Sequence, residues 1–258
     1  MKIFKIITCL LVFLLLAINM SYASPNKDYC NKRMGSDYQG IGRESEKLQE
    51  VELFYVLVQK HLEPTKNVVV ENARTIYLLK GIEHASKGKY DKAIEQFKKA
   101  LILNPKDALA HNCLGGAYKS KGMLDEAIKA YKKALILNPK DARAHTSLAA
   151  VYERKKMRDE AIEEYKKAIA IDPEYFRPHY DLGVAYKCKG MVDEAIEEYK
   201  KALVIDPNNA KTHYELALLY CNKKQYDLSI EHCDKAIKYG KKSSMLLKRL
   251  APFRNKDY

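Results

Sequence analysis

The sequence has no tryptophan and little glycine or proline, with 11 Gly and 8 Pro among its 258 residues. These contents exclude a collagen-like chain and a proline-rich low-complexity chain. Disorder as the main state is excluded too, because 47% of the residues are hydrophobic and 31% are charged, as in ordinary globular proteins. The formal net charge is +13. Nineteen tyrosines beside no tryptophan indicate that one aromatic position recurs along the chain.

The sequence also lacks the common motifs of catalysis and cofactor binding. It has no glycine-rich phosphate loop, no G-x-S-x-G and no H-E-x-x-H. Its six cysteines include no C-x-x-C pair. We therefore expect no catalytic residues, no metal site and no cofactor, and no nucleic-acid partner is expected.

The N-terminus has the pattern of a secretory signal peptide. Lys2 and Lys5 precede an apolar run over residues 6–18, and Ser21-Tyr22-Ala23 supplies a small-x-small cleavage site. The run is shorter than the roughly 20 residues that a membrane-spanning helix needs. Cleavage of residues 1–23 is therefore favoured over an uncleaved anchor, with no membrane span afterwards. We expect an exported protein whose residues 24–43 form a flexible segment.

The rest of the chain repeats with a period of 34 residues. Prolines recur at this spacing at Pro105, Pro139, Pro173 and Pro207. The segments that end in them align in register as KGKYDKAIEQFKKALILNP, KGMLDEAIKAYKKALILNP, KKMRDEAIEEYKKAIAIDP and KGMVDEAIEEYKKALVIDP. A fifth copy, KKQYDLSIEHCDKAIKYGK, follows without the proline. Such a period is the signature of a repeat array.

This pattern resembles the tetratricopeptide repeat (TPR) family, whose unit carries W-x-x-L-G-x-x-Y, then A-x-x-x-F, then P. The second copy matches these positions with His111, Leu114, Gly115, Tyr118, Ala127, Tyr131 and Pro139. The resemblance implies an all-α fold, a right-handed superhelical solenoid of helix-turn-helix repeats. The expected repeats are residues 74–107, 108–141, 142–175, 176–209 and 210–243.

Capping helices are expected at both ends of the array. An apolar pattern over residues 44–62 predicts a helix stopped by Pro64, within an N-terminal cap and linker of residues 44–73. A short helix over residues 244–251 is expected to end at Pro252, within a C-terminal cap and tail of residues 244–258.

Each repeat carries signals for the ends of its helices. Gly122 suits the left-handed residue that ends a first helix. The aspartate that follows this turn is expected to be the N-cap of the second helix. These aspartates are Asp91, Asp125, Asp159, Asp193 and Asp227. Small residues such as Gly115 and Ala149 predict a close approach of the two helices, with Tyr131 and its equivalents beside them.

Histidine and cysteine give two candidate sites. One histidine recurs in each of four repeats, at His111, His145, His179 and His213. Equivalent residues of stacked hairpins lie about 10 Å apart, too far to share a metal ion through bonds of about 2.0 Å. We expect these histidines to fill an aromatic slot between helices. A disulfide could join Cys188 and Cys221 of adjacent repeats, with Cys233 as the competing partner of Cys221 and buried free thiols as the favoured alternative.

The resemblance places the binding surface in an inner groove lined by the first helix of each hairpin. Its basic residues would be Lys119, Arg143, Arg154, Arg177, Lys187 and Lys211, against one acid, Glu153. The same side carries Asn112, Tyr180, Val184, Tyr214 and Leu218. Positive charge beside apolar anchors predicts a partner segment of acidic character. The family's carboxylate clamp is absent, because Asn112 and Gly116 stand where its Lys and Asn pair would be.

The sequence therefore predicts a non-catalytic protein–protein interaction scaffold or adaptor that binds a protein or peptide in this groove. Self-association stays open. From the resemblance, the bacterial periplasm and cell-envelope assembly are favoured, ahead of the extracellular space or the inner membrane through an uncleaved signal. The alternative function is binding of an anionic envelope polymer through lysine- and arginine-rich faces.

Overall fold

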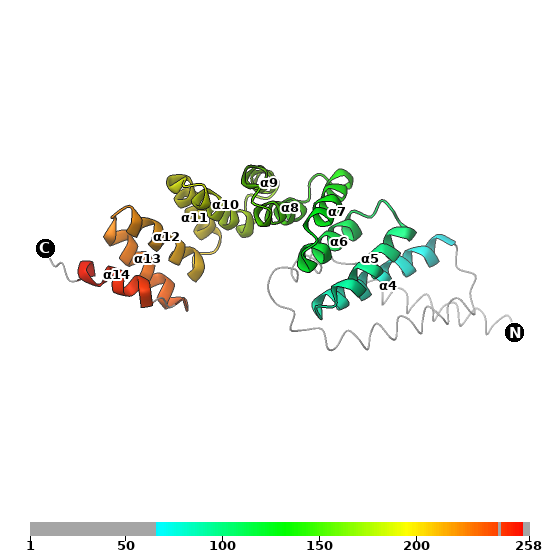
Figure 1. Cartoon of the computed structure of the whole chain (residues 1–258), viewed down its shortest axis with the longest axis horizontal. Coiled ribbons are helices and arrows are strands. Elements are labelled where there is room, and N and C mark those ends of the chain that lie inside the picture. The colour runs from blue at the N-terminus through cyan, green and yellow to red at the C-terminus, as the bar shows by residue number, and fades with distance from the viewer. Residues whose placement is uncertain (1–65, 242–243, 255–258) are drawn as a thin grey trace, which may run out of the picture. The chain divides into compact units, whose positions relative to one another are not determined.

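A computed structural model describes residues 66–241 and 244–254 (Figure 1). All of them lie in one compact unit, Glu52–Tyr258. Within the described residues the chain forms eleven helices and no strand. In chain order these are α4 (Lys66–Ser86), α5 (Tyr90–Leu103), α6 (Ala108–Lys121), α7 (Leu124–Leu137), α8 (Ala142–Arg154), α9 (Arg158–Ile171), α10 (Phe176–Cys188), α11 (Val192–Ile205), α12 (Ala210–Asn222), α13 (Tyr226–Lys238) and α14 (Ser244–Arg254).

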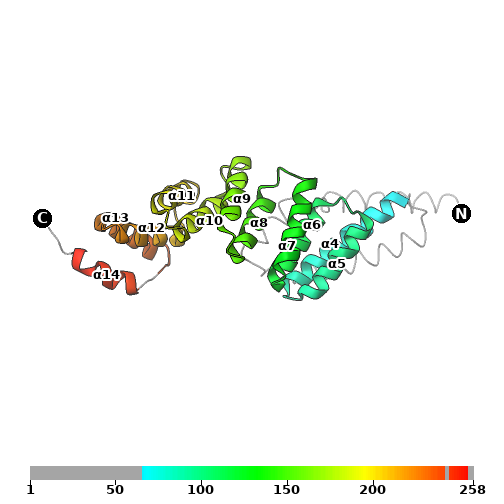
Figure 2. The same cartoon turned by 45° about the horizontal axis from the view of Figure 1, so that its top comes forward.

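The helices pair into hairpins that follow one another along the chain (Figures 1 and 2). Each first helix packs on its second helix, and each second helix packs on the first helix of the next hairpin. First helices of successive hairpins also touch, as α6 does α8 and α8 does α10. The all-α solenoid expected from the 34-residue period is confirmed, because one hairpin buries its apolar stripe only against its neighbours.

Four of the expected repeat starts coincide with the start of a helix. Residues 108, 142, 176 and 210 each begin a first helix. The helix α4, however, begins at Lys66, inside the segment expected to be a linker. The signal peptide, the flexible segment and the capping helix expected over residues 44–62 lie outside the described residues.

The turn within each hairpin needs one left-handed residue. Gly122 supplies it after α6, with φ 88°. The third and fifth repeats have lysine at the equivalent position, and Lys156 and Lys224 adopt φ values of 62° and 59°. A side chain with a β-carbon is strained in this region. The shared hairpin geometry therefore overrides the local preference of these two lysines.

The expected N-cap role of the repeated aspartates is wrong. Asp125 is the second residue of α7, and Met123 occupies the N-cap without a side-chain hydrogen bond. Asp125 instead forms an ion pair with Lys155 at the end of the next repeat's first helix. The same pairing joins Asp91 to Lys121, Asp159 to Lys189 and Asp193 to Lys223.

Aspartate does cap helices elsewhere, at the start of the first helices. Asp141 accepts hydrogen bonds from the amides of Arg143 and Ala144 at 3.0 and 3.1 Å. Asp107 and Asn209 cap α6 and α12 in the same way. An N-cap must precede its helix, and each second helix begins two residues earlier than an aspartate N-cap would require.

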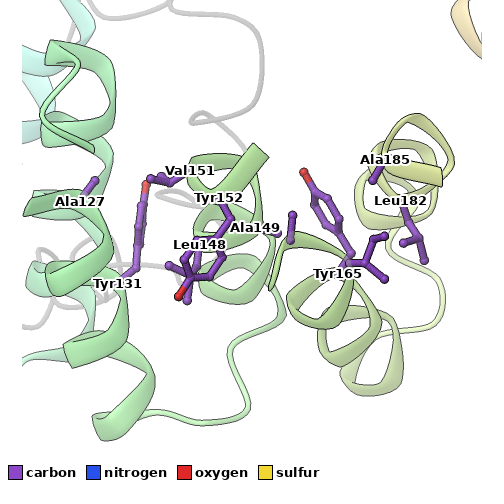
Figure 3. Close-up of a cluster of buried hydrophobic side chains, with 11 residues drawn as sticks. Ala127, Tyr131, Leu148, Ala149, Val151, Tyr152, Tyr165, Leu182 and Ala185 are labelled. Atoms are coloured by element: carbon purple, nitrogen blue, oxygen red, sulfur yellow. The ribbon is translucent and has the colours of Figure 1, made fainter. Parts of the chain in front are cut away.

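Small residues allow the two helices of a hairpin to approach closely, as expected. A β-carbon on Gly115 would lie 2.8 Å from the ring of Tyr131. Tyr131 is 1% exposed and belongs to a cluster of side chains that also includes Leu148 and Val151 of α8 (Figure 3). Each such aromatic ring therefore fills the space inside its own hairpin and extends the core into the next one.

The C-terminal helix continues through the proline that was expected to end it. The helix α14 includes Pro252 and ends at Arg254. Leu246 and Leu250 are buried against α12 and α13. The ring of Phe253 stacks on Tyr226 at a centroid distance of 3.5 Å, which holds the last turn in place. Proline costs little here because it breaks only one hydrogen bond, near an exposed helix end.

Candidate functional site

The residues expected to bind a partner lie on α6, α8, α10 and α12, and together form what we call the first-helix face. They recur at equivalent positions of the 34-residue unit, so Arg143, Arg177 and Lys211 each stand in the first turn of their helix. Arg177 and Lys211 are exposed, and Arg143 is half-buried. The guanidinium of Arg143 lies over the ring of Tyr175 at 6.0 Å.

The structure brings together cations from three successive repeats. Lys119 lies in the last turn of α6, Arg154 is the last residue of α8, and Arg177 is the second residue of α10. Arg154 Nη1 donates to the backbone carbonyl of Lys119 at 2.5 Å. Burial lowers the pKa of Lys119, and the nearby positive charges of Arg177 and Arg154 lower it further.

Two acids on this face were missed by the sequence reasoning. Asp181 accepts from Arg177 Nε at 2.6 Å, and Glu215 accepts from Lys187 Nζ at 2.6 Å. With Glu153, the six basic residues therefore face three acids, and the positive charge is smaller than expected. The pair of Arg177 and Asp181 could have been predicted from the sequence, because residues spaced i, i+4 are neighbours on a helix. The pairing of Lys187 with Glu215 crosses repeats and has no local signal.

Two acids of this face are less inclined to ionise than free carboxyl groups. Burial raises the pKa of Asp181, although Arg177 opposes the shift. Burial likewise raises the pKa of Glu153. Burial disfavours the charged form of acids and of Lys119 alike, and the surplus of positive charge rests on the six basic residues against three acids.

The apolar anchors are shared between the face and the core. Tyr180 stacks on Phe176 at 6.0 Å and packs against Tyr199 at 5.7 Å. Val184, Tyr214 and Leu218 are half-buried beside the buried clusters of the last repeats. Tyr214 also lies under the ammonium of Lys241 at 5.2 Å. A partner could therefore contact only part of each of these side chains.

Several polar atoms of the face are buried without a hydrogen-bond partner. These are Asn112 Oδ1, Arg143 Nη1 and Glu153 Oε1. Asn112 was expected to contact a partner, but its side chain is only 3% exposed. Buried polar groups are nearly always hydrogen-bonded to protein, water or a ligand, so these three atoms have capacity for a further partner.

The histidine ladder has a structural role in every repeat that carries it. Nε2 of His111, His145, His179 and His213 lies 3.0 to 3.1 Å from the carbonyl oxygen of the proline six residues earlier. The other ring nitrogen bonds to the second helix in three repeats. Among the residues that the structure describes, no group of three or more potential ligands could hold a metal ion.

Cys188 and Cys221, for which a bridge was the less favoured possibility, are both free thiols in the structure. Cys188 is exposed at the end of α10, and Cys221 is buried in α12. Cys113 and Cys233 are buried as well. The possible bridge between Cys188 and Cys221 gains no support from this arrangement.

None of the helices in the described part of the chain is long and apolar enough to cross a membrane.

Comparison with protein families and solved structures gives a consistent result. A TPR repeat model matches residues 81–122, 115–156, 159–190 and 185–224, and a tetratricopeptide repeat model matches residues 210–239. The crystal structure of MamA is 30% identical, with a TM-score of 0.58 over 62% of this chain and 93% of MamA. Comparison with curated proteins gives no match.

Two further solved structures share the fold. Pseudomonas aeruginosa PilF is 23% identical, with a TM-score of 0.66 over 73% of this chain and 87% of PilF. YrrB, described as a TPR protein with an unusual peptide-binding site, is 22% identical, with a TM-score of 0.58 over 79% of this chain and 99% of YrrB.

Proposed function

The chain belongs to the tetratricopeptide repeat family, and on that premise we propose that it is a non-catalytic interaction scaffold. Its first-helix face forms the groove in which a segment of a partner protein binds. TPR folds are built for recognition, because the stacked first helices present many side chains along one continuous surface.

The observation that carries this proposal is the unmet hydrogen-bonding capacity of the face. Arg143 Nη1 and Glu153 Oε1 are buried and unpartnered on α8. Each such group costs about 1–3 kcal/mol until a partner is supplied. A peptide backbone carries both N–H donors and carbonyl acceptors. Its carbonyl groups can accept from the Arg143 guanidinium, and its N–H groups can donate to the Glu153 carboxylate on the same helix.

The half-buried aromatics favour a peptide over a simple ion. Tyr180 and Tyr214 are the apolar anchors beside the charged groups, and tyrosine is enriched among the residues that dominate peptide interfaces. That YrrB is described as peptide-binding supports the same assignment by analogy of fold. Acidic character of the partner follows from the surplus of positive charge.

We place this scaffold in the bacterial periplasm, in cell-envelope assembly. The basis is the signal-peptide pattern of residues 1–23 together with the small TPR array. Immunodetection in fractionated cells tests the placement, and recovery of the protein from the cytoplasm alone would contradict it.

Affinity capture from a native envelope extract tests the function. The bait is the full chain, beside the variant Arg143→Glu/Arg177→Glu/Lys211→Glu. A matched control, Lys92→Glu/Lys129→Glu/Lys140→Glu, changes the charge equally at exposed lysines outside the first helices. We expect one or a few proteins to be retained by the wild type and the control, and lost from the first variant. Equal retention by all three baits would exclude the first-helix face.

An anionic envelope polymer is the second candidate, favoured by the formal charge of +13. Polymer binding would weaken steeply with salt and would tolerate Tyr180→Ala. Peptide binding would lose most of its affinity on Tyr180→Ala or Tyr214→Ala at constant salt.

A further inference from the structure

Two lysines at equivalent positions of the repeat have different surroundings. Lys187 of the fourth repeat donates to Glu215 of the fifth repeat at 2.6 Å. Lys119 occupies the same position in the second repeat, and there the residue equivalent to Glu215 is Ser147. The second repeat therefore keeps the cation and lacks the acid that neutralises it in the fourth.

In the described part of the chain, no acid is hydrogen-bonded to the ammonium of Lys119. Asp181 is the one acid whose charge favours the ammonium form of Lys119 there. Asp181 is itself bound to Arg177 Nε at 2.6 Å. Arg177 and Arg154 add two positive charges to the same place, and Arg154 is held there by its bond to the Lys119 carbonyl.

Resting on the function proposed above, we propose that Lys119, Arg154 and Arg177 form a subsite for a carboxylate of the partner segment. The ligand's carboxylate takes the place that Glu215 occupies beside Lys187. Arg177 uses Nε for Asp181, which leaves its terminal nitrogens for a further acceptor. A carboxylate between two guanidinium groups and an ammonium gains charge-assisted hydrogen bonds and relieves the repulsion among the cations.

The carboxylate comes from an acidic side chain or from a chain end, and the spacing of the repeats favours side chains. Successive first helices lie about 10 Å apart, and a peptide in the polyproline II conformation advances about 3.1 Å per residue with three residues per turn. Every third side chain of such a ligand therefore points to the same side and meets an equivalent position of the next repeat. A ligand with an acid at every third residue keeps an acid at the subsite when it shifts by one repeat.

The probe is a fluorescein-labelled peptide of Glu-Ala-Ala triplets with an amidated C-terminus. Its counterparts are Gln-Ala-Ala triplets with an amidated end, and the same triplets with a free C-terminal carboxylate. Binding to the full chain is measured by fluorescence anisotropy at physiological ionic strength. We expect the glutamate peptide to bind at least about tenfold more tightly than the amidated glutamine peptide. A hydrogen bond to a charged group contributes an affinity difference of about this size.

Three variants separate the subsite from general electrostatics. Lys119→Met removes the central cation. Lys121→Met removes the same charge from the same helix end, where the lysine pairs with Asp91. Ser147→Glu supplies an internal carboxylate that copies the pair of Lys187 and Glu215. We expect Lys119→Met and Ser147→Glu to abolish the preference for glutamate, and Lys121→Met to keep it.

The outcomes are distinct. Equal binding of the glutamate and glutamine peptides, both lost on Tyr180→Ala, would overturn the subsite and leave the groove function standing. An equal loss in Lys119→Met and Lys121→Met, or full binding by Ser147→Glu, would overturn it too. If the wild type binds none of the peptides, the subsite proposal is wrong. The scaffold function is then tested by the affinity-capture experiment alone. Preference for the free chain end over glutamate side chains would support the subsite with the other source of carboxylate.

A second measurement reports on Lys119 itself. After reductive ¹³C-methylation, each lysine gives an NMR signal whose shift follows its pKa. We expect the glutamate peptide and the Ser147→Glu substitution each to move the titration of the Lys119 signal to higher pH, because a carboxylate favours the ammonium form. An unchanged titration would show that no carboxylate reaches Lys119.

Discussion

His213 and His232 face each other through their Nδ1 atoms at 2.8 Å, between the two helices of the last repeat. In the third and fourth repeats the same histidine faces a glutamate, with His145 2.5 Å from Glu164 and His179 2.7 Å from Glu198. His213 Nε2 lies 3.0 Å from the carbonyl of Pro207, so Nε2 carries the proton and Nδ1 accepts. His232 must then donate from Nδ1, which fits two neutral rings.

This pair makes the last repeat sensitive to acid. Burial and the neighbouring His213 lower the pKa of His232 to about 4, and burial lowers the pKa of His213. The groups around them include Lys200, Lys235 and Glu231, with Tyr220 and Tyr239 stacked on the rings. A folded-state pKa below the unfolded value of about 6.5 means that the pair's stabilisation is present above that pH and is lost as the pH falls toward 4.

We therefore expect hydrogen exchange in α12 and α13 to speed up between pH 7 and pH 5, after correction for the intrinsic rates, by the equivalent of on the order of 2 kcal/mol. His232→Glu copies the pair of the neighbouring repeats. It should remove this sensitivity, because a protonated His213 then gains an ionic partner. Equal acid sensitivity of the two proteins would exclude the histidine pair as its source.

The two classes of aspartate should differ in their contribution to stability. Asp141→Ala removes a helix N-cap and is expected to lower the free energy of unfolding by about 1 kcal/mol. Asp125→Ala removes only an exposed ion pair with Lys155 and should cost less than Asp141→Ala. Urea unfolding of the two variants checks this order, and a larger loss from Asp125→Ala would restore the cap role that the sequence suggested.

Replacing a lysine that adopts a left-handed backbone conformation with glycine should stabilise the protein. Lys156 has φ 62° where other repeats have glycine. Lys156→Gly is expected to raise the stability by about 1 kcal/mol, because glycine is unstrained there. Lys155→Gly, one residue earlier at φ −85°, should not stabilise the protein. Thermal unfolding of both variants is the measurement, and a loss of stability in Lys156→Gly would contradict the strain.

The C-terminal helix should depend on one buried leucine. Leu250 is fully buried against the last repeat, whereas Met245 of the same helix is 69% exposed. Leu250→Ala is expected to cost about 2–5 kcal/mol and to release α14, while Met245→Ala leaves it in place. Limited proteolysis between α13 and α14 reports the difference, and equal cleavage of the two variants would show that Leu250 does not anchor the helix.

The sequence alone determined the hairpins, their number and their register. A 34-residue period, glycine or its substitute in each turn and a proline after each second helix act locally, so they can be recognised without a partner segment. The same regularity placed Gly115 against Tyr131, because small and aromatic residues recur at a constant separation in the unit. The first helices α6, α8, α10 and α12 begin at the expected repeat starts, whereas each second helix begins two residues before the position that the expected aspartate caps require.

Tertiary structure decided the interactions that cross from one repeat to the next. From the sequence, Asp125 is interpreted as a helix cap, but in the structure it pairs with Lys155. Glu215 carries no sequence signal for a partner, but in the structure it accepts a hydrogen bond from Lys187. Lys119 differs from Lys187 because Ser147 stands where Glu215 would be and because Arg154 bonds to its carbonyl. Such contacts join residues about 30 positions apart, and local propensity carries no information on them. The stacking of the repeats therefore decides which charges on the first-helix face remain without a partner.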